Sequence, residues 1–124
     1  MVPGPSWTAD PLAGRRAERE RLIGLARGYV ADLSRRLPLA AAVVAGSVAR
    51  GDFNLWSDVD VVIVSDALPE PGPDRAAALG AGAPPHVEPH GYTSTEFRRG
   101  LARGDRLACE ALAHGVLLHG TLPS

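Results

Sequence analysis

The sequence predicts a single domain of the α+β class, a mixed α/β fold with a small β-sheet. Three features of the 124-residue chain predict it. Between residues 15 and 37, apolar residues recur at three- and four-residue steps, which is typical of an amphipathic helix. Two short segments follow that are typical of strands, the apolar run of residues 39–45 and residues 58–65, which contain a second apolar run at residues 61–64. A Thr93-x-x-Glu96 pattern then predicts the start of another helix.

The N-terminal segment differs in composition from the rest of the chain. Residues 1–14 hold three prolines and two glycines, so we expect a flexible arm, and we expect the domain to span residues 15–124. The first helix begins at Pro11 or Arg15 and ends before Pro38, because the proline ring disfavours continuation of a helix.

Two strands flank a turn in the middle of the chain. The apolar run of residues 39–45 is continuous, which favours a strand buried on both faces. In the second strand, residues 58–65, side chains alternate between the faces, so Asp58 and Asp60 share one face and Val59 lies on the other.

The elements in the second half of the chain are predicted mainly from the positions of its proline and glycine residues. Residues 66–85 are rich in proline, glycine and alanine, which favours loop with a helical turn at residues 74–79. Residues 86–92 form a third strand, and Pro89 within it predicts an edge position, because proline cannot donate a ladder hydrogen bond. Two helices and a short final strand follow, at residues 93–103, 105–114 and 116–119.

Composition excludes several classes of function. The net charge of −1 gives no support for bulk nucleic-acid binding, and no apolar run approaches the ~20 residues of a membrane span. All thirteen basic residues are arginine, which excludes lysine Schiff-base chemistry and a P-loop lysine. A single cysteine, Cys109, leaves no intramolecular disulfide to form and indicates a cytoplasmic location.

Asp58 and Asp60 are the first candidate site residues. At positions i and i+2 of a strand their side chains point to one side, about 6.5–7 Å apart along the chain. Two such carboxylates can hold a pair of hard cations that also bind phosphate oxygens, and Mg²⁺ favours this ligand set. Taken alone, the pattern also fits a solvated Asp-x-Asp at a strand end.

Gly46 and Ser47 precede this pair, and ten residues separate Ser47 from Asp58. Glycine allows a phosphate to approach the backbone, and the helix start that follows offers free N–H groups. The Ser47 hydroxyl can donate to a phosphate oxygen, although the pair alone also fits an ordinary helix N-cap. Together with the carboxylates and strands, it predicts a phosphate site that faces a metal site.

The string GSVARGDFNLWSDVDVVIV, residues 46–64, resembles the minimal nucleotidyltransferases of the DNA polymerase β-type superfamily. A looser resemblance extends over residues 39–119. The resemblance implies a nucleotidyltransferase-type fold, a small mixed sheet with helices packed on one side. It also implies Mg²⁺-dependent transfer of a nucleoside monophosphate, AMP from ATP, to an acceptor hydroxyl with release of pyrophosphate.

Carried over position by position, the resemblance assigns roles to individual residues. Gly46 and Ser47 would hold the β- and γ-phosphates, and Asp58 and Asp60 would hold the ions of a two-metal site. The third carboxylate of the family corresponds to Glu88, which would help to bind one metal and activate the acceptor. A solvated edge glutamate is the alternative at this position, where the family more often has aspartate.

Other residues near the motif carry weaker predictions. Arg50 matches the arginine of the family's G-S-x-A-R-G pattern and could contact a phosphate. A structural ion pair with Asp52 or Asp58 is its alternative. Ser57 is expected to order the turn before Asp58, and Trp56 is expected to pack in the loop rather than stack on a base.

Three alternating residues of the third strand, His86, Glu88 and His90, could share one strand face and form a transition-metal site. Exposed imidazoles near a sheet edge are the interpretation that we favour at this point, because Pro89 could break the alternation.

The resemblance also implies a second role that is not purely enzymatic. Minimal nucleotidyltransferases often accompany small helical HEPN proteins, which are ribonuclease-like toxins. The alternative function is therefore an antitoxin module that neutralises a HEPN-type partner by adenylylation or by binding. Homo-oligomer formation and the activity of the isolated chain are left open by the sequence.

Overall fold

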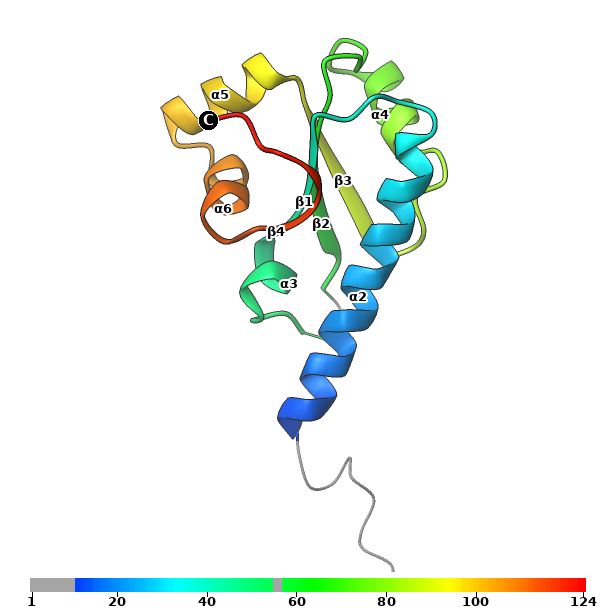
Figure 1. The fold of residues 1–124 in the computed structure, drawn as a ribbon, viewed down its shortest axis with the longest axis vertical. Helices are drawn as coiled ribbons and strands as arrows, with labels where there is room; N and C mark the ends of the chain where they lie inside the picture. Colours follow the sequence, from blue (N-terminus) through cyan, green and yellow to red (C-terminus); the bar gives the residue numbers. More distant parts are fainter. Residues whose placement is uncertain (1–10, 55–56) are drawn as a thin grey trace, which may run out of the picture.

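The computed structural model describes residues 11–54 and 57–124 (Figure 1). Residues 1–10 of the predicted arm and Trp56 lie outside this part of the chain. The elements in chain order are α2 (Pro11–Ser34), β1 (Ala41–Ala45), α3 (Gly46–Arg50), β2 (Val59–Val64), α4 (Pro73–Gly80), β3 (Val87–Tyr92), α5 (Ser94–Arg103), α6 (Arg106–His114) and β4 (Val116–Gly120).

The strands form one four-stranded mixed sheet with the order β3-β2-β1-β4. β1 pairs antiparallel with both β2 and β4, whereas β2 and β3 run parallel. The predicted edge position of β3 is confirmed. Pro89 pairs in register with Val61, so the alternation of side chains continues through the proline.

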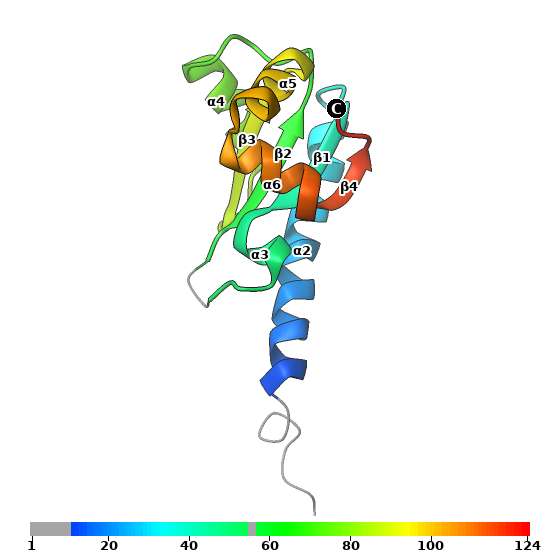
Figure 2. The same cartoon turned by 90° about the vertical axis from the view of Figure 1, so that its left-hand side faces the viewer.

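Helices cover both faces of this sheet. Val59, Val61 and Ile63 of β2 belong to a core cluster with α2. Val62 and Val64 point the other way and pack with residues of α5 and α6. Figure 2 shows α5 and α6 in front of the sheet and α2 behind it.

The α+β fold and the mixed sheet are therefore confirmed, but the expectation of helices on one side is corrected to helices on both. The physical reason lies in β1, where every residue is buried. A strand without a polar face must be covered on both sides.

Helix α2 begins at Pro11, the earlier of the two predicted positions, so residues 11–14 are helical rather than part of an arm. Its C-terminal half packs on the sheet, and its N-terminal half extends past the strands toward α3 (Figures 1 and 2). The hydroxyl of Tyr29 donates to the carbonyl of Leu79, 2.6 Å away, which connects α2 to α4. Burial raises the pKa of Tyr29 to about 12.

The predicted capping box at the start of α5 is confirmed. The Thr93 hydroxyl accepts from the N–H of Glu96, and the Glu96 carboxylate accepts from the N–H of Thr93 at 2.7 Å. The same carboxylate accepts from Arg75 at 2.7 Å. Partial burial tends to raise the pKa of Glu96, but the bonds from Arg75 and Thr93 outweigh it and leave the pKa below its ordinary value.

Within residues 11–54 and 57–124, no helix combines the length and the apolar character needed to cross a bilayer.

We expect Glu96→Gln to lower the free energy of unfolding at pH 7 by about 1 kcal/mol. A carboxylate whose pKa falls on folding stabilises the folded state above its unfolded pKa of ~4.3, and the contribution is lost as pH falls through the folded pKa. Urea titrations from pH 7 to pH 3 should therefore show the difference between variant and parent shrinking below about pH 4. The exposed Glu70→Gln is the control, and a difference that grows on acidification would contradict the role given to Glu96.

Candidate active site

The strand register places Gly46 beside Asp60. Ala45, the last residue of β1, stands opposite Asp60 of β2, and the chain turns into α3 at the next residue. Gly46 has a φ of +69°, in the left-handed region that favours glycine. A Cβ at this position would overlap the Asp60 carboxylate. Position 46 therefore requires glycine both for its backbone conformation and for the close approach of Asp60.

Ser47 lies in the first turn of α3 and does not cap it. The N-cap position belongs to Ala45, and no side chain makes a capping hydrogen bond. The alternative of an ordinary serine N-cap is therefore wrong. Because the first N–H groups of a helix have no intrahelical partners, the backbone here retains donors in addition to the Ser47 hydroxyl.

An open cleft of about 340 Å³ begins at this turn. One wall comes from the sequence motif and holds Gly46, Ser47, Arg50 and Asp60. The opposite wall comes from the first turns of α6 and consists of Arg106, Leu107 and Glu110. The structure therefore brings four of the predicted site residues together, and it adds a wall that the sequence motif does not contain.

Two arginines of the cleft share one carboxylate. Arg50 donates to Oε2 of Glu110 at 2.8 Å, and Arg106 donates to Oε1 of the same residue at 3.2 Å. Arg50 also donates to Asp52 at 3.1 Å. Of the two alternative ion-pair partners considered for Arg50, Asp52 is the one present, and Glu110 is a further partner that was not predicted. The shared carboxylate holds two cationic groups close to the Gly46–Ser47 turn.

Arg106 and Glu110 were not predicted from the sequence to be site residues. Asp105 offered a signal, because its side chain accepts from the N–H of Ala108 and so caps α6 immediately before Arg106. The cap fixes where the helix begins, but the packing of α6 against α3 is a tertiary feature that a local pattern does not contain.

Arginines of α2 hold the motif from outside the cleft. Arg19 donates to the carbonyls of Val48 and Ala49 at 2.9 and 3.0 Å, near the C-terminal end of α3. Cations at this end of a helix satisfy its last carbonyls and oppose its dipole. Arg15 donates to the carbonyls of Gly51 and Phe53 and stacks over the Phe53 ring. These contacts fix the segment that leads from α3 toward Asp58.

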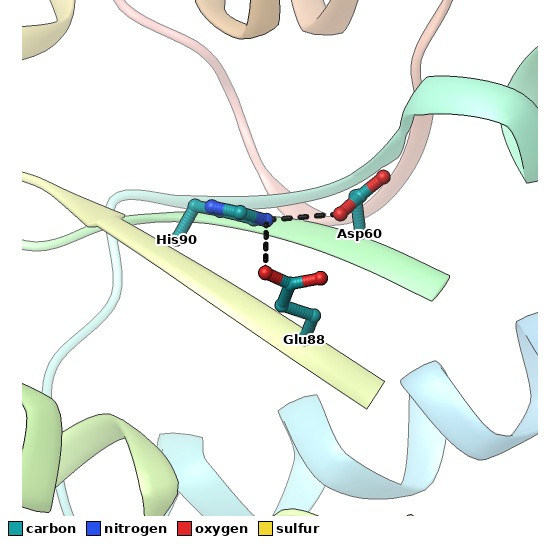
Figure 3. A group of neighbouring side chains, drawn as sticks. All are labelled: Asp60, Glu88 and His90. Atoms are coloured by element: carbon teal, nitrogen blue, oxygen red, sulfur yellow. Dashed lines mark hydrogen bonds and ion pairs between the residues drawn. The ribbon is translucent and has the colours of Figure 1, made fainter. Parts of the chain in front are cut away.

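A second group of polar residues lies on the other side of Asp60. In the parallel pairing of β2 and β3, Asp60 stands opposite Glu88, and His90 follows on the same face. The Nε2 atom of His90 lies 2.9 Å from Oδ1 of Asp60 and 3.9 Å from Oε1 of Glu88 (Figure 3). The ligand atoms of the three residues all lie within 4.8 Å of one another.

The hydrogen bond with Asp60 raises the pKa of His90 above its ordinary value. Partial burial acts in the opposite direction, and the negative charges of Asp60 and Glu88 act in the same direction as the hydrogen bond. The cluster is thus a partly enclosed site of negative potential, which suits a cation.

Asp58 lies apart from this cluster. It precedes β2, its side chain is 51% exposed, and its Oδ1 atom lies 3.3 Å from Nδ1 of His86. His86 has a φ of +71° and lies outside β3, so it does not share the site formed by Glu88 and His90. The expected alternation through His86 is therefore broken at His86 and not at Pro89. The role of Asp58 as a metal ligand stays a prediction.

The prediction that Ser57 orders the turn before Asp58 is confirmed. The hydroxyl of Ser57 accepts from the backbone N–H of Asn54 at 2.9 Å.

A glycine-serine turn, two arginines and facing carboxylates at one end of a mixed sheet have the chemistry of an enzyme that binds a polyphosphate. The chain belongs to the nucleotidyltransferase domain family, whose model matches residues 27–102. The matched stretch contains all six predicted site residues, from Gly46 to Glu88. Family membership assigns nucleotidyl transfer to the protein as its general reaction.

The structure is also similar to the crystal structure of a candidate nucleotidyltransferase from Sulfolobus solfataricus. The TM-score is 0.61 at 23% sequence identity, and the similarity covers 94% of this chain and 89% of that chain. At this identity the likeness shows a common fold. A comparison with curated proteins found no match.

The contact between Gly46 and Asp60 predicts different outcomes for two glycine substitutions. Gly51 has a φ of +86° with open space around its Cβ position, so Gly51→Ala should cost about 1–2 kcal/mol from backbone strain alone. Gly46→Ala adds the overlap with Asp60, so it should cost more in urea denaturation and should also abolish nucleotide binding in calorimetry. Equal stability and equal nucleotide binding in the two variants would contradict the close approach.

Proposed function

We propose that the protein transfers AMP from ATP to an acceptor hydroxyl and releases pyrophosphate in a reaction that depends on a divalent metal ion. The acceptor oxygen bonds to the α-phosphorus as the bond from phosphorus to the β-phosphate oxygen breaks, and the hydroxyl proton is lost. The observation that carries the proposal is the cleft in which the Gly46–Ser47 turn faces Asp60, because a polyphosphate there meets backbone donors and a carboxylate site together.

The residues of the cleft would each make a different contact with the bound nucleotide. Gly46 leaves room for the Asp60 carboxylate beside the turn, and the Ser47 hydroxyl is a donor for a phosphate oxygen. Arg50 and Arg106 supply positive charge and planar donors that suit phosphate oxygens. Because Glu110 already bonds to both arginines, their guanidinium groups are oriented before a nucleotide binds, which reduces the entropy lost on binding.

The carboxylates of Asp60 and Glu88 would hold the metal ion. Asp60 and Glu88 offer oxygen ligands from neighbouring strands, and Asp58 is the proposed ligand of a second ion. Magnesium is the ion that carboxylates alone would favour. A bound divalent ion stabilises negative charge as it develops on the oxygens of the reacting phosphate. Glu88, whose side chain is 56% exposed at the sheet edge, is the proposed acceptor of the hydroxyl proton.

The implied antitoxin role and its HEPN-type partner stay predictions, as do homo-oligomer formation and the cytoplasmic location.

Labelled ATP tests the reaction type. With candidate acceptors and a divalent ion, label from α-³²P-ATP should enter the acceptor, while label from γ-³²P-ATP should appear only in pyrophosphate. Asp60→Asn should reduce transfer at least about a hundredfold, because it removes a carboxylate shared by the cleft and the metal site. Glu70→Gln, an exposed acid outside the cleft, should leave transfer unchanged.

Incorporation of the γ-label into the acceptor would show phosphoryl transfer and would reject the proposed reaction. Full activity in Asp60→Asn would reject the proposed site.

Arg106 should distinguish a triphosphate from a monophosphate. We expect Arg106→Gln to weaken ATP binding about tenfold, or ~1.4 kcal/mol, because it removes a charge-assisted contact to phosphate. AMP binding should change much less, since AMP lacks the β- and γ-phosphates. Calorimetric titration of both nucleotides measures the difference. Arg98→Gln makes the same charge change on α5, and an equal effect there would show that only net charge matters.

A further inference from the structure

The cluster of Asp60, Glu88 and His90 contains a donor that a magnesium site does not need. Asp60 and Glu88 are direct neighbours across the parallel strands, and both offer oxygen. His90 adds a nitrogen, and Figure 3 shows its Nε2 atom directed toward both carboxylates. The side chains of His90 and Asp60 are 31% and 27% exposed, so the cluster is partly shielded from water.

The distances within the cluster fit ligands around one ion. Metal–ligand bonds of about 2.0–2.2 Å to histidine nitrogen and carboxylate oxygen place neighbouring ligand atoms about 3 Å apart and opposite ones about 4 Å apart. His90 Nε2 lies 2.9 Å from the Asp60 oxygen and 3.9 Å from the Glu88 oxygen.

The donor set indicates which ion is held. Mg²⁺ takes oxygen ligands and water, whereas imidazole suits first-row transition metals. At a mixed nitrogen and oxygen site, affinity for these metals rises from Mn²⁺ through Co²⁺. A histidine among the ligands therefore shifts the site away from Mg²⁺.

We propose that Asp60, Glu88 and the Nε2 atom of His90 bind one divalent transition-metal ion and that the imidazole makes this site prefer such an ion over Mg²⁺. The proposal rests on the proposed function in one respect, because the same ion would serve nucleotidyl transfer. His86 takes no part, since its imidazole is directed to Asp58.

Cobalt is the probe, because its visible absorption changes when protein ligands replace water around the ion and can be read without any enzymatic turnover. Titration of the full chain with Co²⁺, in the absence of nucleotide, should give a saturable absorption band with one ion per chain. A roughly hundredfold excess of Mg²⁺ should fail to remove the band. Because loss of a residue that only supports a ligand costs 10–100-fold in metal affinity, loss of His90 itself should cost at least about tenfold.

Two variants of His90 and one matched control complete the experiment. His90→Ala and His90→Asn should both lose the band, and circular dichroism checks that each is folded. His119→Ala removes an exposed histidine of β4, on the far edge of the sheet from β3, and should keep the band with unchanged affinity. Glu88→Gln should weaken Co²⁺ binding, because it removes one oxygen ligand.

The proposal is overturned if no saturable band forms, if folded His90 variants bind Co²⁺ as tightly as the parent, or if equimolar Mg²⁺ displaces it. Each of these results leaves nucleotidyl transfer with Mg²⁺ on the carboxylates intact. Conversely, a His90-dependent cobalt band without any transfer of label from ATP would reject the proposed function and retain the metal site.

Discussion

The close approach of the Gly46 backbone to the Asp60 carboxylate is the contact on which the rest of the site depends. The antiparallel register of β1 and β2 creates it, because Ala45 and Asp60 are partners and the chain turns immediately afterwards. Any side chain at position 46 would displace Asp60. From this contact, the cleft with Arg50 and Arg106 extends to one side, and the cluster with Glu88 and His90 extends to the other. Asp60 is therefore the residue that the cleft and the cluster have in common.

The helices on the two faces of the sheet contribute to this site in different ways. On one face, Arg19 of α2 bonds to backbone carbonyls of α3, and Arg15 of α2 bonds to backbone carbonyls of the segment that follows α3. Neither arginine lines the cleft. On the other face, α6 supplies Arg106 and Glu110 as a wall of the cleft. Tyr92 of β3 donates to Asp105 at 3.3 Å, and Asp105 caps α6, so the sheet helps to fix where that wall begins. Helices on both faces of the sheet thus help to position the residues that line the cleft.

Much of this architecture is readable from local sequence. The apolar run of β1, the alternation in β2, the capping box of Thr93 and the edge position implied by Pro89 each follow from the physics of a short segment. The apolar run of β1 already indicated burial on both faces, whereas the expectation of helices on one side came from the resemblance alone. The positions of Gly46 and Asp60 followed from motif spacing, although the overlap that forbids a side chain at position 46 is a tertiary contact.

The remaining parts of the site depend on how distant elements meet. Arg106 and Glu110 reach the cleft only because α6 packs against α3 and β1, and nothing in the sequence near Arg106 specifies that packing. His90 reaches Asp60 because β3 runs parallel to β2 in a fixed register. Alternation along β3 placed Glu88 and His90 on one face but could not name the strand beside them. His86 shows the converse. Alternation assigned it to the same face as Glu88 and His90, but its own positive φ places it outside β3.

A crystal structure of the protein with a non-hydrolysable ATP analogue and a divalent ion would test the central claim most directly. The account predicts that the polyphosphate lies against the backbone of Gly46 and Ser47, with the ion between a phosphate oxygen and the Asp60 carboxylate. A nucleotide bound elsewhere on the protein, or a polyphosphate that contacts the turn while Asp60 makes no contact with the ion, would contradict it.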